Sequence, residues 1–379
     1  MRRPWLLAFM ALGLCFAGPA GTGSADAAHP FQYGDVVRIA PNTLLVAGRP
    51  LDAEKGEADI GNAILYRPRR TLYVIDTGAT PSFRPFLRKA IKGLRPFNKL
   101  VLINTHGHPD HIGNDALVTG LNVTSVRHYM SRKDFPVADH YLKVSLAKAF
   151  KRVSGYIPGF DHPVAQARDL YSLFDPVEQS RWTRRAIEAL PGQRIKIGNL
   201  RTRGWVFGND DVEVIRSGAH TPGELIVYFP RTRLLHMSDE LVSYYPAFPE
   251  ADADGTRRVF GEALKAAHGG AVRRLTDGHT FTVYRGPGHV RKHVRSFIYG
   301  YDAYSRVVKS ILRAAGPTGA TVSEIIDGVA DAPAMRRAPG GPNPGGPLFG
   351  ALQALKKLQQ LHALSDGGPR ATRRFHLPH

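Results

Sequence analysis

The stretch Thr105-His106-Gly107-His108-Pro109-Asp110-His111 is the strongest functional signal in this chain of 379 residues. It places three histidines and one aspartate within six residues. Burying so many imidazole and carboxylate groups is costly unless a cation compensates them. In a tight loop, His106 and His108 can converge on one ion, while Asp110 and His111 can reach a neighbouring ion. The spacing therefore predicts a metal site rather than a polar surface loop.

A run of apolar and β-branched residues at 99–104 leads directly into this stretch and predicts a buried strand. Similar short runs end at a turn or at a polar residue elsewhere in the chain. They lie at residues 62–67, 71–75, 212–216, 225–229, 233–237 and 271–275. Because loops beyond strand ends carry function on a rigid scaffold, the polar residues that follow these runs are candidates for the same site.

Residues 129–190 follow a different pattern, which predicts a mostly helical insertion. Apolar residues recur at helical spacing over 141–153 and again over 177–190, where Pro191-Gly192 ends the pattern. The insertion could cover a site that the strands on either side build.

The first 27 residues are typical of a secretory signal peptide. Arg2 and Arg3 give a positive start, an apolar run follows, and Ala25-Asp26-Ala27 supplies an A-x-A cleavage pattern. No other apolar stretch is long enough to span a bilayer. The single cysteine is Cys15, so the mature chain would have no thiolate ligand and no cysteine nucleophile. We expect a soluble, exported protein that is periplasmic or secreted.

The chain is strongly basic, with 51 Lys and Arg residues against 32 Asp and Glu residues and a net charge of +19. Such a charge is compatible with nucleic acid, with anionic substrates or with an anionic cell envelope. The basic residues are scattered, which favours a generally basic surface. The predicted export argues further against a nucleic-acid partner, and we expect a small-molecule substrate.

The C-terminal part, residues 316–379, resembles a winged-helix module in the order of its elements. Before it, residues 289–315 predict one or two helices. Thr321 and Glu324 form a capping-box pattern at the start of the next helix. Leucines then recur at helical spacing, and a hairpin signal follows at 365–368. Such a module could pack against the main domain or mediate a homodimer.

Together the motifs resemble the metallo-β-lactamase-fold superfamily of binuclear metallohydrolases over about residues 36–300, apart from the insertion. Asp76, after the run at 71–75, matches the aspartate that orients a ligand histidine in that family. The turn at 218–223 matches a G-x-H-T-P-G motif that carries His220. The resemblance implies an α+β fold, an αββα four-layer sandwich, to which this chain adds the helical insertion and the C-terminal appendage.

The resemblance also implies a set of ligands for two metal ions. They are His106, His108 and His220 for one ion, Asp110, His111 and His279 for the other, and Asp239 as a bridge between the two. Glu240 is an alternative to Asp239, and His289 is an alternative to His279. Zinc is the expected metal, although a ligand set of nitrogen and oxygen alone also suits manganese or iron.

An enzyme of this kind attacks its substrate with a metal-bound hydroxide, and Asp110 could orient that nucleophile and later pass on its proton. True β-lactamases of the superfamily typically lack a bridging aspartate, so Asp239 argues against antibiotic hydrolysis. Residues 234–248 resemble secreted alkyl-sulfatase relatives, which have a glutamate where this chain has Asp239. We expect hydrolysis of a carboxylic ester, lactone, thioester or sulfate ester. The alternatives are a phosphodiesterase acting on nucleic acid and a β-lactamase.

Overall fold

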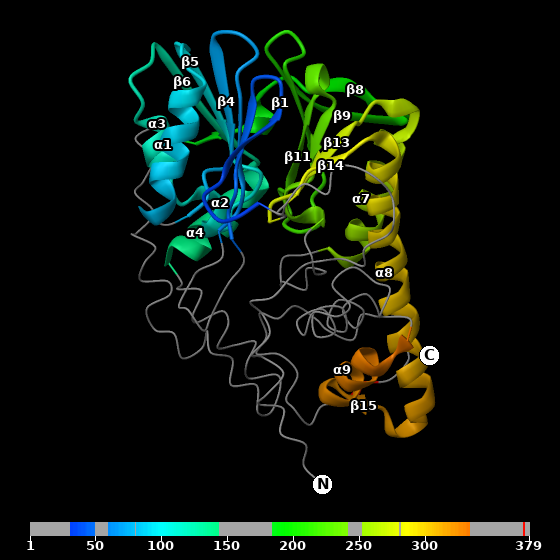
Figure 1. Cartoon of the computed structure of the whole chain (residues 1–379). Coiled ribbons are helices and arrows are strands. Elements are labelled where there is room, and N and C mark those ends of the chain that lie inside the picture. Colours follow the sequence, from blue (N-terminus) through cyan, green and yellow to red (C-terminus); the bar gives the residue numbers. More distant parts are fainter. Residues whose placement is uncertain are drawn as a thin grey trace.

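The computed structural model describes residues 31–49, 60–79, 81–143, 184–241, 252–279, 282–333 and 374–375. Within these residues, two β-sheets of seven strands each pack face to face. Helices cover the outer face of each sheet (Figure 1). This four-layer arrangement, in the order αββα, confirms the fold class that the motifs predict.

The first sheet has the strand order β1-β2-β3-β4-β5-β6-β7. Its strands are β1 (Val36–Ala40), β2 (Thr43–Val46), β3 (Ala63–Tyr66), β4 (Thr71–Ile75), β5 (Lys99–Ile103), β6 (Ser125–Met130) and β7 (Arg185–Ala186). The pairs from β1 to β4 are antiparallel, and the pairs from β4 to β7 are parallel. The loops that follow β4, β5 and β6 therefore leave the sheet at the same edge.

The second sheet has the strand order β14-β13-β12-β11-β10-β9-β8. Its strands are β8 (Gln193–Ile197), β9 (Leu200–Phe207), β10 (Val212–Arg216), β11 (Leu225–Phe229), β12 (Leu234–His236), β13 (Arg274–Thr276) and β14 (Tyr284–Arg285). All pairs are antiparallel except β12 and β13, which run in parallel. The loops after β12 and β13 thus also share one edge.

Side chains from the inner faces of the two sheets form the central core. Tyr66 of β3 meets Phe229 of β11 edge-on, with ring centroids 5.2 Å apart. Val227 faces the same core, whereas Ile226 and Tyr228 face the helices on the other side. Because β11 is buried on both faces, its sequence is continuously apolar instead of alternating.

Within the described residues, four α-helices accompany the first sheet. They are α1 (Arg84–Gly93), α2 (Pro109–Ile112), α3 (Asp115–Thr119) and α4 (Phe135–Lys143). Helix α1 buries Leu87, Ala90 and Ile91, which recur every three or four residues and pack on the outer face of the sheet. Short 3-10 helices join several elements: η2 (Pro81–Phe83), η3 (Arg132–Asp134), η4 (Ile187–Ala189), η5 (Pro230–Thr232), η6 (Ser238–Leu241), η7 (His268–Gly270) and η8 (Gly316–Thr318).

Helices α7 (Ala253–Ala266) and α8 (Pro287–Ala315) cover the outer face of the second sheet, and α9 (Val322–Asp331) packs on α8. Phe260 of α7 lies 5.7 Å from Phe297 and 6.4 Å from Tyr301 of α8, measured between ring centroids. These aromatic contacts join the two long helices above the sheet.

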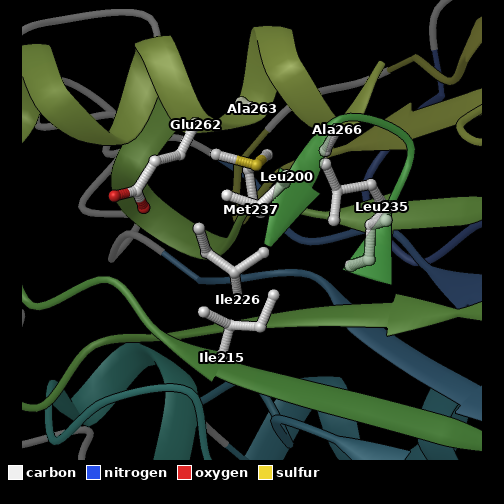
Figure 2. Close-up of a pocket in the computed structure, with 9 residues that line it drawn as sticks. Leu200, Ile215, Ile226, Leu235, Met237, Glu262, Ala263 and Ala266 are labelled. Atoms are coloured by element: carbon white, nitrogen blue, oxygen red, sulfur yellow. The ribbon is translucent and has the colours of Figure 1, made fainter. Parts of the chain in front are cut away.

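A small apolar cavity lies between α7 and the second sheet (Figure 2). Leu200, Ile226, Met237 and other apolar side chains line it. The one charged residue at its margin is Glu262, whose carboxylate points away from the apolar side chains and pairs with Arg258 at 3.1 Å. A cavity without convergent polar groups cannot orient a ligand, so we regard this cavity as a gap in packing.

The predicted helix over 177–190 is wrong for the part that the structure describes. Residues 185–186 form strand β7, and η4 follows. Strand β7 extends the parallel edge of the first sheet by pairing with β6, and Ile187 then enters the central core. Pairing with an open sheet edge thus overrides the local helical spacing.

The start of the predicted insertion also needs correction, because residues 129–130 complete β6. Helix α4 confirms a helical beginning of the insertion, and residues 144–183 lie outside the described part. Strand β13 begins three residues later than the run at 271–275 predicts. Ala271 still has helical angles at the end of η7, with a φ of −62° and a ψ of −37°, so the extended backbone begins after it.

The region before the tail is a single helix, α8, so the predicted domain end near residue 300 falls inside an unbroken element. The capping box of Thr321 and Glu324 is confirmed at the start of α9. Strand β15 (Ala320–Thr321) pairs with β16 (Arg374–Phe375). The signal segment, the leucine repeat and the hairpin signal lie outside the described residues, and the winged-helix interpretation stays a prediction. Among the described residues, no helix combines the length and apolar character needed to cross a bilayer.

Glu213 lies in β10 opposite Tyr228, and burial together with the nearby Asp210 raises its pKa from 4.5 to about 7. The folded form therefore holds an extra proton between these values and loses stability as the pH rises from about 4.5 to about 7. We expect Glu213→Gln to remove this loss. Thermal unfolding followed by circular dichroism should show that the variant gains more in melting temperature over the wild type at pH 8 than at pH 5. An equal gain at both pH values would contradict the assignment.

Candidate metal centre

Loops at one edge of the two sheets carry the residues that the motifs single out. Asp76 follows β4, the 105–111 stretch follows β5 and enters α2, His220 follows β10, Asp239 lies in η6 after β12, and His279 follows β13. The parallel pairs β4–β5 and β12–β13 send their loops toward the same place. The structure thus brings every predicted site residue together.

His106, His108 and His220 form the first donor group. His106 Nε2 and His220 Nε2 each lie 3.0 Å from His108 Nδ1. The rings of His106 and His108 stand at 81° to each other, and those of His108 and His220 at 87°. All three side chains are buried, and one nitrogen of each ring faces the other rings of the group.

Asp110, His111, Asp239 and His279 form the second donor group. His111 Nε2 lies 3.2 Å from Asp110 Oδ2 and 3.3 Å from Asp239 Oδ1. His279 Nε2 lies 3.3 Å from His111 Nε2 and 3.2 Å from Asp110 Oδ2. In each of the two groups, the donor atoms all lie within 4.8 Å of one another.

Asp239 stands between the two groups. Its Oδ2 atom lies 3.1 Å from His279 Nε2 in the second group. The same oxygen lies 3.7 Å from His220 Nε2 and 3.9 Å from His106 Nε2 in the first group. One carboxylate therefore faces both sets of donors.

The tautomer of His111 makes its second nitrogen a donor atom for a cation. Its Nδ1 lies 2.9 Å from Asp76 Oδ2 and is the nitrogen that donates a proton to this carboxylate. Its Nε2 faces the carboxylates of Asp110 and Asp239 and offers a cation its lone pair whenever no proton occupies it. A lone pair facing anions is unfavourable unless a positive charge lies between them, and this donor set fits divalent ions that take nitrogen and oxygen ligands.

The charges around His111 support this reading. Burial opposes a proton on this ring, but the carboxylates of Asp239, Asp110 and Asp76 together raise the pKa of His111 well above its ordinary value. Burial would raise the pKa of Asp239, yet His279 and His111 outweigh it and hold that pKa well below its ordinary value. The second donor group thus keeps Asp110 and Asp239 ionised and attracts positive charge.

Asp76 holds the histidine loop as well as His111. Its Oδ1 accepts a hydrogen bond from Thr105 N at 2.7 Å, and its Oδ2 accepts one from Thr105 Oγ1 at 2.6 Å. Its backbone is left-handed, with a φ of 57°, a conformation that aspartate and asparagine tolerate better than most residues. This carboxylate therefore fixes both the loop and the orientation of one donor ring.

The geometry distinguishes between the alternative donors Asp239 and Glu240 and between His279 and His289. Asp239 lies among the donors, whereas Glu240 Oε1 accepts hydrogen bonds from Ala219 N at 3.1 Å and His220 N at 3.3 Å. His279 lies in the second donor group, whereas His289 is exposed on α8. Glu240 thus supports the loop of His220, and His289 lies away from the site.

Glu224 is a buried residue of this region that the sequence motifs do not single out. Its Oε1 accepts a hydrogen bond from Asp239 N at 3.1 Å, and its Oε2 lies 3.3 Å from His106 Nδ1. Burial and the carboxylates of Glu240 and Asp239 raise its pKa well above the ordinary value. Its position directly after the 218–223 turn and before the apolar β11 was a signal of burial beside the site.

A second missed acid, Asp115, ties the loops together behind the donors. Its Oδ1 accepts hydrogen bonds from Thr77 Oγ1 at 2.9 Å and Asn104 Nδ2 at 3.0 Å. Thr77 follows Asp76, and Asn104 precedes the histidine stretch. Asp115 therefore fixes both loops at points next to the residues that form the site. Nothing in its local sequence sets it apart from an ordinary residue at the start of a helix.

Comparison with known proteins gives a family match over the same region. The model of the metallo-beta-lactamase superfamily matches residues 56–279. The human protein named metallo-beta-lactamase domain-containing protein 1 is 31% identical over 111 residues. That alignment covers 28% of this chain and only 38% of the human protein.

Solved structures share the fold at low sequence identity. A beta-lactamase domain protein from Burkholderia ambifaria has a TM-score of 0.57 and 19% identity, over 88% of this chain and 90% of that chain. A metallo-beta-lactamase family protein from Thermus thermophilus has a TM-score of 0.55 and 15% identity, over 85% of this chain and 95% of that chain. A stereoselective inverting sec-alkylsulfatase from Pseudomonas sp. has a TM-score of 0.55 and 14% identity, over 85% of this chain and 49% of that chain.

Replacement of Asp76 by asparagine tests its part in holding His111. The amide tolerates the left-handed backbone but cannot accept hydrogen bonds through both of its atoms. We expect zinc affinity of the second donor group to fall about 10- to 100-fold, as for other partners of ligand histidines. Competition with a chelating dye measures that affinity. Unchanged zinc binding in a folded Asp76→Asn protein would refute this role.

Proposed function

Because the chain belongs to the metallo-beta-lactamase superfamily, we propose that it is an exported hydrolase that binds two zinc ions and cleaves an ester-type bond. The observation that carries the proposal is the junction of the two donor groups at Asp239, whose carboxylate faces rings of both. A carboxylate in this position suits a bridge between two ions about 3.5–4 Å apart. Manganese or iron would suit the same nitrogen and oxygen donors.

Each donor group supplies the ligands of one ion. We assign His106, His108 and His220 to the first ion, Asp110, His111 and His279 to the second, and Asp239 to both. When bound, the ions would lower the pKa of water toward about 7 and stabilise negative charge that develops on the substrate. The buried rings are fixed before substrate arrives, so little reorganisation accompanies the reaction.

Asp110 is the residue to which we assign the orientation of the attacking water. Its side chain is 16% exposed, against 3% for Asp239, so it is the carboxylate that a water or substrate can reach. Burial would raise its pKa, but His111 and His279 hold that pKa well below its ordinary value. An ionised carboxylate accepts a hydrogen bond from water, and it can later pass on the proton that it takes from that water.

The proposed substrates are carboxylic esters, lactones, thioesters and sulfate esters. Asp239 argues against β-lactams, because a bridging carboxylate would occupy coordination space that lactamases of this fold leave to substrate or water. The shared fold of the sec-alkylsulfatase supports including a secondary alkyl sulfate among the substrates to be tested. The net charge of +19 suits an anionic substrate.

The proposal extends to the parts of the chain around this core. Residues 1–27 would direct export, and the mature protein would be periplasmic or secreted. The catalytic domain would begin near residue 36 and include α8, and residues 316–379 would form the winged-helix-like module.

Metal analysis of the purified mature protein tests the two-ion assignment. We expect close to two equivalents of zinc in the wild type and a loss of about one equivalent in His108→Ala, because the first group then keeps only two imidazoles. His289→Ala is the matched control, since this histidine lies on the exposed surface of α8 and should leave the metal content unchanged. Inductively coupled plasma mass spectrometry measures the content.

The same samples should be assayed against chromogenic esters, lactones, thioesters, sulfate esters, phosphodiesters and a carbapenem. We expect hydrolysis of one of the first four classes, lost in His108→Ala and on chelation, and retained in His289→Ala. Full activity after exhaustive chelation would rule out the metal mechanism. Rapid turnover of the carbapenem or the phosphodiester would replace the proposed substrate class with that alternative.

A further inference from the structure

Asp134 lies at the end of η3, buried and outside both donor groups. Its Oδ2 accepts a hydrogen bond from Gly107 N at 3.0 Å and another from Thr221 Oγ1 at 2.8 Å. Its Oδ1 accepts a hydrogen bond from Gly223 N at 2.8 Å. A single carboxylate thus binds two loops that are more than a hundred residues apart in the sequence.

These loops carry the three histidines of the first donor group. Gly107 stands between His106 and His108, and Thr221 directly follows His220. The hydrogen bonds of Asp134 therefore act at positions adjacent to each ring of the group. The separation of the two loops determines whether the three ring nitrogens lie close enough to converge on one ion.

The backbone around Asp134 leaves no room for the loops to shift toward it. A Cβ atom at position 107 would lie 2.7 Å from Ala138 N, and one at position 223 would lie 2.8 Å from Asp134 N. Contacts this short do not occur, so glycine is required at both positions. The two loops rest directly against η3 and the start of α4.

The helix that presents Asp134 is itself held in place. Asp134 N donates a hydrogen bond to Ser131 O at 3.0 Å. Ser131 Oγ donates to Glu188 Oε1 at 2.6 Å, and Arg132 N donates to Glu188 Oε2 at 2.8 Å. These bonds make η3 a fixed support, because movement of Asp134 would break several of them at once.

The second donor group has other supports. His111 is held by Asp76, and His279 N donates to Asp277 Oδ1 at 2.9 Å. No hydrogen bond joins Asp134 to these residues within the described part of the chain. Loss of Asp134 should therefore affect one donor group and spare the other.

We propose that Asp134 is the positioning residue of the three-histidine group and sets the separation of His108 and His220 at which a zinc ion binds. The proposal rests on the proposed function, because it takes this group to be a zinc site. It adds a residue that touches neither the metal nor the substrate but determines the affinity of one of the two sites.

Asp134→Asn tests this role in the full chain. The amide presents only one acceptor atom to three donors, so at least one backbone N–H loses its partner. His279→Ala leaves the three-histidine group as the intact site, and His108→Ala leaves the other group, so each site can be measured alone. Zinc affinity is measured in both backgrounds by competition with a chelating dye. Asp139→Asn, an exposed change on α4, is the matched control.

We expect Asp134→Asn to weaken zinc binding about 10- to 100-fold in the His279→Ala background and to leave it unchanged in the His108→Ala background. Equal weakening in both backgrounds, or no weakening in either, would overturn the proposal. Failure of the parent His279→Ala protein to bind zinc would instead refute the proposed function, and the role of Asp134 would fall with it.

A second pair of variants covers the case in which Asp134→Asn does not fold. Thr221→Val keeps the shape of the buried side chain but loses its 2.8 Å hydrogen bond to Asp134, whereas Thr221→Ser keeps the hydroxyl. In the His279→Ala background, we expect weaker zinc binding in Thr221→Val and recovery in Thr221→Ser. Identical affinities in the two variants would contradict the link between these loops.

Discussion

This structure depends on one constraint: ring nitrogens and carboxylate oxygens face one another in a buried pocket. His106, His111 and His220 are almost fully buried, and their donor atoms point at other donor atoms. Imidazoles cannot satisfy one another when several lone pairs meet, and ionised carboxylates are costly to bury unpaired. A positive charge between them resolves the conflict, and the raised pKa of His111 reflects the same attraction.

The rest of the architecture keeps these nitrogen and oxygen atoms close to one another. The parallel pair β4–β5 of the first sheet and the parallel pair β12–β13 of the second send the loops that follow these strands to the same edge. The central core then fixes the sheets relative to each other, as in the contact of Tyr66 with Phe229. Buried acids hold the loops themselves: Asp76 behind His111, and Glu240 beneath the backbone of His220. The site is thus built from rigid strand ends, and its donors need not move to receive an ion.

The sequence allowed prediction of the four-layer fold and of the donors, but not of the residues that support them. The 105–111 stretch is recognisable because four donors lie close together in the chain, and each of the other donors follows a strand. Glu224 and Asp115 act through loops that are distant in sequence, so only the folded structure reveals their partners. The same limit explains β7, where pairing with a distant sheet edge outweighs a local helical pattern.

Anomalous diffraction from crystals grown with zinc would locate the metal ions directly. We expect two peaks about 3.5–4 Å apart, one among His106, His108 and His220 and one among Asp110, His111 and His279. Asp239 should lie within bonding distance of both. A single peak, or two peaks of which Asp239 touches only one, would contradict the claim that one carboxylate joins two metal sites.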